Sequence, residues 1–424
     1  MVPKVLIISN NCFSKTDSNG RTLGNLLRGW PKSNLAQFYI QNAVPDSDYC
    51  EQYYRNTDHQ ALTALIGKQN NGIPSEVNFD SRAQTTATVH KKTRNAFSMM
   101  VRDAVWRTGR WKSHFFDEWV SSFHPDIVVL QAGDCPFMFH LAADIAEQYQ
   151  AKFLIYNTEG YYFKNYDYFR ATGIAHALYP LFYRRLKHSV ERAYNSCDYA
   201  VFNCEELESE YKKVFAIKSR VIYNASSITL SGEFDLRRND IFTTVYAGNM
   251  GVGRAESLVM VAKALQAIDS KYKIQVYGKI PDEDVAELFS RCSGIDYRGF
   301  ISYAELISIQ RTADLLLQVE SFEPFYRRDS QFAFSTKIPD SMALGRCFLV
   351  FAPGEFASSS YLAKNHAAHV VTNQDALQET LQRIIEDETY RNQYLQNARE
   401  LVRKNHHQAE NAAAFQNILD QLCE

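Results

Sequence analysis

Short apolar runs alternate with segments long enough for a helix along most of this chain of 424 residues. The alternation predicts parallel sheets with helices on both faces, because two parallel strands need a helix-length crossover between them. The runs fall into two series, which predicts two α/β domains. The first series comprises residues 5–9, 36–40, 126–130, 152–156, 199–203 and 220–223, and the second comprises 242–247, 273–277, 296–300, 315–319, 347–351 and 369–371.

A polar segment with weak periodicity, residues 224–240, separates the two series and is the expected interdomain linker. We therefore predict one domain at residues 1–228 and a second at residues 240–405. The sequence from residue 374 onward predicts successive helices without a strand. The final helix, residues 406–424, has one apolar face that could pack on another element.

The composition is that of an ordinary globular protein, with 46% hydrophobic and 22% charged residues. The formal net charge of -2 gives no global attraction to nucleic acid. Eight cysteines occur without a C-x-x-C pair, which favours free thiols over disulfides or zinc ligands. No apolar run approaches the roughly 18–20 residues that span a bilayer. The N-terminus enters a strand directly rather than a signal peptide, so we expect a cytoplasmic protein.

A polar loop and a short helix, residues 334–345, precede an apolar strand and carry the most informative chemistry. The N-terminus of a helix offers unpaired N–H groups and a positive dipole end, both of which suit a phosphate. Ser335 and Thr336 can add hydroxyl donors, and Lys337 can add a full charge. Asp340 can accept hydrogen bonds from the hydroxyl groups of a sugar. The segment therefore predicts a site for a nucleotide sugar.

The same segment resembles the donor-binding segment of the retaining glycosyltransferases of family 4. In that family a carboxylate opens the segment, and a second follows after seven intervening residues, usually within Glu-Ala-Met-Ala-x-Gly. Residues 340–345, Asp-Ser-Met-Ala-Leu-Gly, match the second part with Asp for Glu, whereas the first carboxylate would fall at Phe332. The Phe-Ser-x-Lys loop at residues 334–337 looks like that of bacterial members that build polysaccharides.

The resemblance implies a GT-B fold, in which two Rossmann-like domains face each other across a cleft and C-terminal helices cross back onto the first domain. It implies transfer of a sugar from a nucleotide-diphosphate sugar to a hydroxyl acceptor, with retention at the anomeric carbon. The acceptor would be a glycan, a lipid-linked saccharide or a similar molecule. No metal or other cofactor is expected, because positive side chains and helix N–H groups would meet the charge of the leaving diphosphate.

A glycine-rich turn between a strand and a helix opens the second series. Gly248 and Gly251 would let the backbone pass close to a ligand. Arg254 occupies the second of two basic positions in the family pattern, and the first basic residue is missing. We predict that Arg254 and Lys337 clamp the diphosphate; the alternative is that Arg254 is a solvated residue at a helix start. Lys279 is a secondary phosphate candidate or an ordinary surface lysine.

Three carboxylates follow predicted strands at the carboxyl ends, where open α/β sheets bind ligands. Glu320 and Glu323 could contact the donor sugar or be solvated loop residues. Glu159 stands where family members often have a His beside the anomeric carbon, and it could contact the reacting sugar, contact the acceptor or serve a closing loop. Gly20 matches a glycine of the family's first loop, which contacts the donor phosphate. Asp134 is a weaker candidate for the same face.

Other segments carry weaker signals. Two stretches rich in basic and aromatic residues, 90–112 and 179–187, predict helices with a cationic side. This side is either simply solvated or makes peripheral contact with a membrane that holds a lipid-linked acceptor. Residues 326–331 read as a loop. The Asp-Ser-Asp sequence at 46–48 fits the metal motif of another transferase fold, but we interpret it as coincidence because it lies in a polar loop.

Two other functions remain open from the sequence. The first is a sugar-nucleotide epimerase of the same architecture, which would reuse Glu159, Glu320 and Glu323 as acid and base groups. The second is an inactive glycosyltransferase-like subunit, which the missing first carboxylate and the missing first basic residue make credible. The sequence does not distinguish uridine from guanosine as the donor base.

Overall fold

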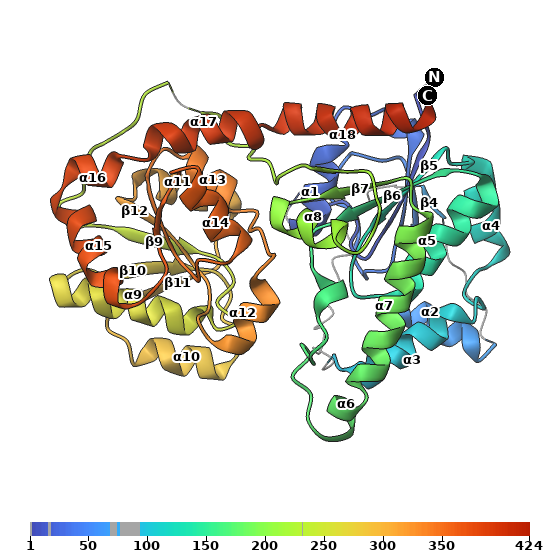
Figure 1. The fold of residues 1–424 in the computed structure, drawn as a ribbon, viewed down its shortest axis with the longest axis horizontal. Helices are drawn as coiled ribbons and strands as arrows, with labels where there is room; N and C mark the ends of the chain where they lie inside the picture. Colours follow the sequence, from blue (N-terminus) through green and yellow to red (C-terminus); the bar gives the residue numbers. More distant parts are fainter. Residues whose placement is uncertain (1, 16–17, 68–73, 77–93, 231) are drawn as a thin grey trace. The chain divides into compact units, whose positions relative to one another are not determined.

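The computed structural model describes residues 2–15, 18–67, 74–76, 94–230 and 232–424 (Figure 1). The chain divides into two compact units. Unit 1 comprises Met1–Ile222 and Ala409–Glu424, and unit 2 comprises Tyr223–Gln408. Within the described residues, no helix combines the length and apolarity that crossing a bilayer requires.

Unit 1 is built on an eight-stranded sheet with the order β4-β3-β2-β1-β5-β6-β7-β8. Every neighbouring pair is parallel except β3 and β4, which are antiparallel. The central strands are buried at every position, as expected for a sheet covered on both faces. The strands are β1 (Val5–Ser9), β2 (Leu35–Tyr39), β3 (Gln52–Arg55), β4 (Pro74–Glu76), β5 (Ile127–Gln131), β6 (Lys152–Asn157), β7 (Tyr199–Phe202) and β8 (Ser219–Val221).

Helices cover this sheet, and α5 packs closely on α7. The helices are α1 (Ser18–Leu26), α2 (Asp58–Leu65), α3 (Ala96–Arg107), α4 (His114–Phe123), α5 (Pro136–Tyr149), α6 (Gly173–Ala177), α7 (Tyr179–Ser196), α8 (Glu205–Lys212) and α18 (Gln408–Cys423), with 3-10 turns at η1 (Lys32–Asn34) and η2 (Tyr161–Phe163).

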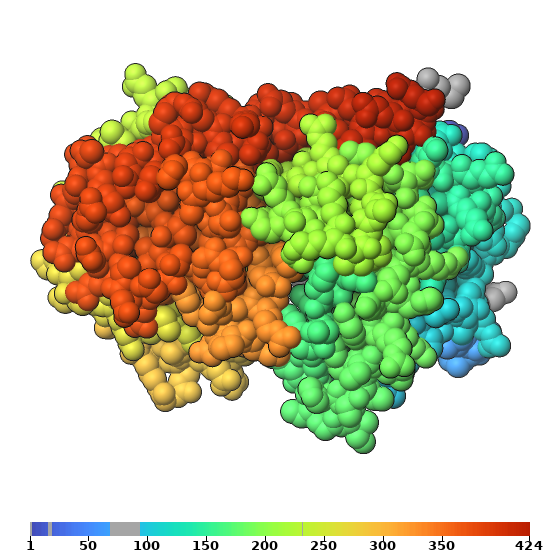
Figure 2. Space-filling view, in the orientation of Figure 1, coloured from blue at the N-terminus to red at the C-terminus, as the bar shows by residue number. Residues whose placement is uncertain are grey.

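The C-terminal helix α18 belongs to the core of unit 1. Phe415, Ile418 and Leu419 join the buried cluster that includes Val5 and Tyr156. The outer side of α18 lies at the surface, where its red segment is visible in Figure 2. The apolar face predicted for the last helix is therefore confirmed, and it packs on the N-terminal part of the chain.

Unit 2 is built on a six-stranded parallel sheet with the order β11-β10-β9-β12-β13-β14. The order reverses beside β9, so a topological switch point lies between β9 and β12. The strands are β9 (Thr244–Ala247), β10 (Ile274–Tyr277), β11 (Ile295–Gly299), β12 (Leu315–Val319), β13 (Cys347–Phe351) and β14 (His369–Val371). The helices are α9 (Arg254–Ile268), α10 (Glu283–Ser290), α11 (Tyr303–Thr312), α12 (Pro324–Ser330), α13 (Ile338–Ala343), α14 (Ala357–Lys364), α15 (Asp375–Glu386), α16 (Glu388–Asn392) and α17 (Leu395–Asn405).

The predicted architecture of two Rossmann-like sheets is confirmed, and all twelve predicted strands are present with some ends shifted. The prediction of a loop at residues 326–331 is wrong, since α12 occupies most of this segment. Pro324 starts this helix with its fixed φ, and two arginines in its last turn suit the negative end of the dipole. The sequence also gave no signal for the short strands β3 and β4.

Candidate functional site

The carboxyl ends of β9, β10 and β12 bring three loops together at one edge of the sheet in unit 2. These loops begin at Gly248, Gly278 and Glu320. This edge includes the switch point, where open α/β sheets bind their ligands. It also carries most of the residues that the sequence predicted for donor binding.

Gly248 lies against the ammonium group of Lys337. A Cβ atom placed on Gly248 would stand 2.6 Å from Lys337 Nζ and 2.9 Å from the hydroxyl oxygen of Tyr246. Gly278 has φ +145°, and a Cβ placed on it would stand 2.2 Å from the carbonyl oxygen of Gly248. Glycine at both positions therefore lets two loops and one cation come together. The structure brings Gly248 and Lys337 into contact, while their role toward a ligand remains a prediction.

Arg254 is the first residue of α9 and is paired with a buried carboxylate. Its Nε and Nη2 donate to Glu320 Oε2 at 2.9 and 2.8 Å. The other oxygen of Glu320 accepts from Gln318 Nε2 at 2.9 Å. Glu320 is buried, and Ser257 Oγ donates to its carbonyl oxygen. These contacts fix the plane of the Arg254 guanidinium and make Glu320 its positioning partner.

Asp340 lies on α13 and is buried. Its Oδ1 accepts from Ser226 Oγ at 2.7 Å, and its Oδ2 accepts from the hydroxyl of Tyr303 at 3.0 Å. Tyr303 is 43% exposed and opens α11. The sequence reasoning missed both partners, because neither lies near Asp340 in the chain.

The remaining predicted donor residues of unit 2 lie around the same edge. Ser335 and Thr336 are half-buried, and Ser335 Oγ accepts from the backbone N–H of Lys337. The backbone N–H of Gly251 donates to Asn249 Oδ1 at 2.9 Å. Glu323 is exposed at the start of α12.

Three exposed aromatic residues, Tyr297, Phe300 and Tyr303, occur within a short stretch of sequence from β11 to the start of α11. Lys279 Nζ lies 5.0 Å from the ring centroid of Phe300, which is 70% exposed. The hydroxyl of Tyr297 donates to the carbonyl oxygen of Gly278 at 2.9 Å. The exposed ring of Phe300 therefore lies beside Lys279, and that of Tyr303 lies beside Asp340.

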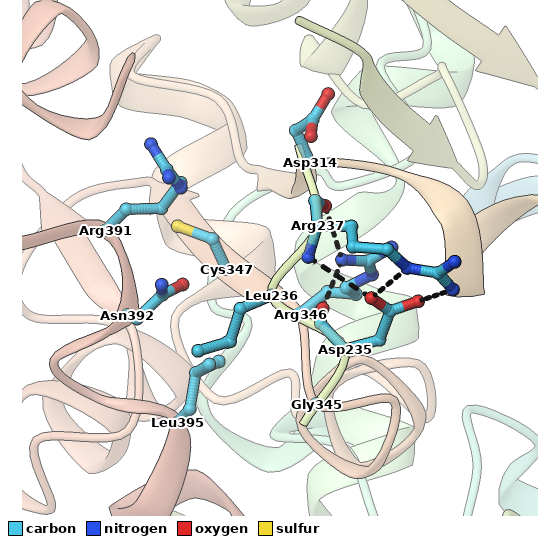
Figure 3. A pocket seen from close by; sticks show the side chains of 10 residues that line it. All are labelled: Asp235, Leu236, Arg237, Asp314, Gly345, Arg346, Cys347, Arg391, Asn392 and Leu395. Atoms are coloured by element: carbon cyan, nitrogen blue, oxygen red, sulfur yellow. Dashed lines mark hydrogen bonds and ion pairs between the residues drawn. The ribbon is translucent and has the colours of Figure 1, made fainter. Parts of the chain in front are cut away.

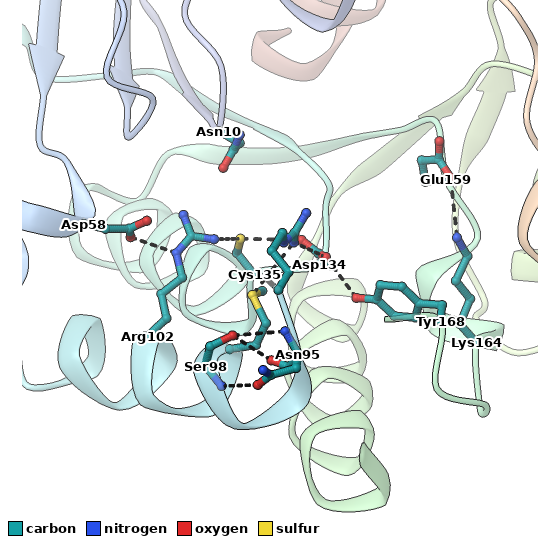
Figure 4. Close-up of polar contacts among 12 residues, drawn as sticks. Asn10, Asp58, Asn95, Ser98, Arg102, Asp134, Cys135, Glu159, Lys164 and Tyr168 are labelled. Carbon is teal, nitrogen blue, oxygen red and sulfur yellow. Dashed lines mark hydrogen bonds and ion pairs between the residues drawn. The ribbon is translucent and has the colours of Figure 1, made fainter. Parts of the chain in front are cut away.

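Unit 1 places Glu159 after β6, close to a lysine (Figure 4). Glu159 Oε2 lies 3.9 Å from Lys164 Nζ. The ammonium of Lys164 in turn lies 4.6 Å from the ring centroid of Tyr161 and 5.2 Å from that of Tyr168. Glu159 is therefore held near a buried cation that also contacts two aromatic rings.

Asp134 follows β5 and is buried among polar partners (Figure 4). It accepts from Arg94 and, at 2.9 Å, from the hydroxyl of Tyr168. Arg102 donates from Nη1 to Cys135 Sγ and from Nε to Asp58. Burial raises the pKa of Cys135 to about 12, so its thiol stays protonated near neutral pH.

Gly20 lies in the first turn of α1 rather than in the loop before it. A Cβ atom on Gly20 would stand 2.2 Å from the carbonyl oxygen of Cys12 and 2.8 Å from the backbone nitrogen of Ser14. Close backbone packing therefore requires glycine here, whether or not a phosphate binds nearby.

The two basic-aromatic stretches are largely engaged inside unit 1, although residues 90–93 lie outside the described residues. Several of their aromatic side chains are buried, and several of the cations have acidic partners. Arg102 pairs with Asp58, and Arg185 Nη1 lies 3.8 Å from Asp103 Oδ2. The buried aromatic residues are Trp106, Trp111, Tyr179 and Phe182.

The Asp-Ser-Asp sequence at 46–48 is also engaged locally. Asp46 Oδ1 accepts from the backbone N–H of Lys15 at 2.7 Å, and Asp48 pairs with Lys32. Within the described parts of the chain, no cluster of three or more His, Cys, Asp or Glu residues is arranged to hold a metal ion.

A small cavity lies at the opposite, amino-terminal edge of the unit 2 sheet (Figure 3). Its volume is about 10 Å³, enough for about one water molecule. Arg346 donates to the carbonyl oxygens of Arg311 and Asp235, and Arg391 donates to those of Ile384 and Ile385. These arginines bind carbonyl groups near the C-terminal ends of α11 and α15 and at Asp235, so the cavity is structural, and it is too small for a nucleotide.

Comparisons with known proteins show which family model part of the chain matches and which fold it has. Residues 254–417 match the family model described as glycosyl transferase-like. The match covers most of unit 2 and the first part of α18. The matched residues begin at Arg254 and include Glu320, Lys337 and Asp340. No protein with a curated description matches the chain.

Solved structures resemble the chain over nearly its whole length. HepE of Anabaena in complex with UDP and glucose is 11% identical with a TM-score of 0.62, and the match covers 99% of each chain. Sucrose-phosphate synthase of Thermosynechococcus elongatus is 13% identical with a TM-score of 0.65, covering 99% of this chain and 98% of that one. WaaG, a glycosyltransferase involved in lipopolysaccharide biosynthesis, is 12% identical with a TM-score of 0.58, covering 98% and 99%. At these identities the likeness shows the fold, which is GT-B.

Proposed function

We propose that this protein transfers a sugar from a nucleotide-diphosphate sugar to a hydroxyl acceptor in the synthesis of a polysaccharide or glycoconjugate. The observation that carries the proposal is the convergence of Gly248, Lys337 and the Arg254–Glu320 pair at the switch point of a GT4-like domain. The similarity to HepE, which binds UDP and glucose, supports a uridine nucleotide as the first donor to test.

In this proposal the diphosphate lies against Lys337 and Arg254. Arg254 presents its guanidinium in the orientation set by Glu320, and the hydroxyls of Ser335 and Thr336 add donors. These groups favour departure of the diphosphate because they meet the charge that develops on the leaving oxygen. Gly251 and Lys279 complete the phosphate surroundings, and Glu323 lies where it could contact the sugar.

The nucleoside end lies toward Asp340. A ribose hydroxyl donates to the carboxylate of Asp340 in exchange for the hydroxyl of Tyr303. The base stacks on the exposed aromatic surface of Phe300, near Lys279. Aromatic stacking tolerates either uracil or guanine, so the ring surface alone does not select the base.

The reaction exchanges one bond at the anomeric carbon. The bond from that carbon to the diphosphate oxygen breaks, and a bond to the acceptor oxygen forms on the same face. The acceptor proton passes to the leaving phosphate, so no protein base is required. In unit 1 we assign Glu159 to the reacting sugar or the acceptor and Gly20 to the donor phosphate.

The acceptor side is proposed to include peripheral contact with the inner face of a membrane, which suits a lipid-linked saccharide. The exposed apolar side chains of Phe97 on α3, Ile174 on α6 and Leu181 on α7 support this contact, because these three helices touch one another. Arg184 is exposed on α7 beside them. Sedimentation with anionic vesicles tests the contact, and equal recovery of wild type and Ile174→Asp in the pellet would contradict it.

A donor screen tests the proposed function. Purified protein is incubated with UDP-sugars or GDP-sugars and with saccharide acceptors, and released nucleoside diphosphate is measured. We expect release with one donor class, and a loss of at least about tenfold in Lys337→Ala and in Arg254→Ala, since each removes a charge-assisted contact. Near-normal turnover in both variants would refute the clamp.

The same screen separates the two alternatives. Conversion of the donor to an isomeric nucleotide sugar without acceptor would indicate an epimerase. Absence of binding to both uridine and guanosine nucleotides would indicate an inactive subunit. Nuclear magnetic resonance of the product then reports whether the anomeric configuration is retained.

A further inference from the structure

The two segments that lead into and out of unit 2 meet within that unit. Unit 2 begins at Tyr223 and ends at Gln408. The backbone N–H of Ser226 donates to the carbonyl oxygen of His406 at 3.0 Å, and Ser226 forms an isolated parallel bridge with His407. We call residues 223–228 the entry segment and residues 405–408 the exit segment. Residues far apart in the sequence are thereby joined at one place.

His406 holds this junction together. Its side chain is fully buried, with Nδ1 2.7 Å from the carbonyl oxygen of Asn224 and Nε2 2.9 Å from the hydroxyl oxygen of Tyr361. A carbonyl oxygen can only accept, so Nδ1 carries the proton and Nε2 accepts from Tyr361. The hydroxyl of Tyr361 also accepts from Asn405 Nδ2 at 2.8 Å. A directed chain of hydrogen bonds therefore runs from the exit segment to the entry segment.

The same junction is bonded to both ends of the segment 334–340, which comprises a loop and the first residues of α13 and is called the 334–340 loop below. Asn224 Nδ2 donates to the carbonyl oxygen of Phe334 at 2.9 Å, and Ser226 Oγ donates to Asp340 Oδ1 at 2.7 Å. The ring of Phe334 stacks on that of His406, with centroids 6.0 Å apart and planes at 18°. Lys337, the central cation of the candidate site, lies between these two attachment points in the sequence.

Asn224 makes this attachment at a cost. Its side chain is buried, and its Oδ1 has no hydrogen-bond partner among the described residues. A buried acceptor without a partner destabilises the folded protein. An apolar residue would avoid that cost but would lose the N–H group that holds Phe334. The arrangement therefore indicates that the hydrogen bond from Asn224 to the carbonyl oxygen of Phe334 matters more than a partner for Oδ1 of Asn224.

We propose that Ser226, Asn224 and His406 are positioning residues that fix the 334–340 loop for nucleotide binding. This inference rests on the proposed function for the identity of the ligand. Ser226 holds Oδ1 of Asp340, which leaves Oδ2 oriented toward the hydroxyl of Tyr303. Loss of the Ser226 hydroxyl frees the carboxylate to rotate, and the loop that carries Lys337 loses one of its two attachments.

The test compares Ser226→Ala with Ser359→Ala in the full chain. Ser359 is the matched control, because it is buried in unit 2 and its Oγ has no partner among the described residues. The first measurement is hydrogen exchange of the backbone amides of residues 335–341 in the ligand-free protein. The second is the Kd for UDP and for GDP by calorimetry. Ser226→Thr, which restores a hydroxyl, serves as the rescue variant.

We expect Ser226→Ala to speed exchange at residues 335–341 at least tenfold and to weaken binding of the preferred nucleotide by about tenfold, the effect of losing about one charge-assisted hydrogen bond. Ser359→Ala should match wild type in both measurements. Unchanged exchange in Ser226→Ala would overturn the proposal, as would an equal increase throughout unit 2, which indicates general destabilisation. If wild type binds neither nucleotide, the proposed function fails, and the exchange measurement alone decides the positioning role.

Discussion

Replacing Gly248 by alanine should weaken ligand binding in a protein that still folds. The added Cβ would stand 2.6 Å from Lys337 Nζ, so the ammonium must leave its position. The end of a lysine side chain moves easily, and this displacement costs little folding free energy. The hydroxyl of Tyr246 at 2.9 Å must also shift, and overpacking of this kind costs about 1–3 kcal/mol. The variant should therefore fold while holding Lys337 away from the diphosphate.

The expected loss of affinity follows from the lost contact. A hydrogen bond to a charged group contributes about 1.5–3 kcal/mol, which corresponds to an increase in Kd of about 10-fold to 150-fold. Calorimetry with the preferred nucleoside diphosphate measures this change, and urea unfolding measures the change in stability.

A double-mutant cycle tests whether the effect passes through Lys337. If Gly248→Ala acts by displacing the ammonium, the double variant Gly248→Ala/Lys337→Ala should bind no more weakly than Lys337→Ala alone. Additive losses of affinity would refute the reasoning, as would wild-type affinity in Gly248→Ala.

Three further predictions concern stability. Gly278→Ala should lower the free energy of unfolding by more than about 2 kcal/mol, because φ +145° and a carbonyl oxygen at 2.2 Å oppose a Cβ, and wild-type stability in urea would contradict this. Glu320→Gln should lower the free energy of unfolding by about 2 kcal/mol, since it removes the charge that compensates Arg254. The control Glu323→Gln, at an exposed position, should change the free energy of unfolding by less than about 0.5 kcal/mol. Burial lowers the pKa of His406 to about 4, so the unfolded state binds the proton more readily and stability is lost as pH falls from 6.5 toward 4. Between pH 7 and pH 5 the titration of His406 should lower the free energy of unfolding by about 2 kcal/mol. If His406→Gln loses as much stability over this pH range as wild type, the loss does not come from His406.

The fold could be predicted because buried parallel strands consist of continuous runs of apolar residues in the sequence. Leu315–Val319 and Cys347–Phe351 have the predicted bounds, and every residue in both is buried. The strand Gln52–Arg55 escaped prediction because polar residues flank its two tyrosines and it is only four residues long. A sequence pattern of only four residues cannot be distinguished from that of a loop.

The candidate site was only half predictable, for a related reason. Local motifs pointed to Gly248, Arg254, Lys337 and Asp340, whose chemistry is visible in the sequence around them. Their partners are distant in the chain, since Arg254 and Glu320 are 66 residues apart and Ser226 and Asp340 are 114 residues apart. Only the folded sheet brings such pairs together. The predicted roles of all these residues toward a ligand stay predictions until a nucleotide is bound.

The most direct test is a crystal structure of the protein soaked with UDP or GDP. Our account predicts electron density for two phosphates within hydrogen-bond distance of Lys337 Nζ and the Arg254 guanidinium, with a ribose hydroxyl on Asp340. A diphosphate bound elsewhere, or a loop in which Phe332 and its neighbours fill that position, would contradict it.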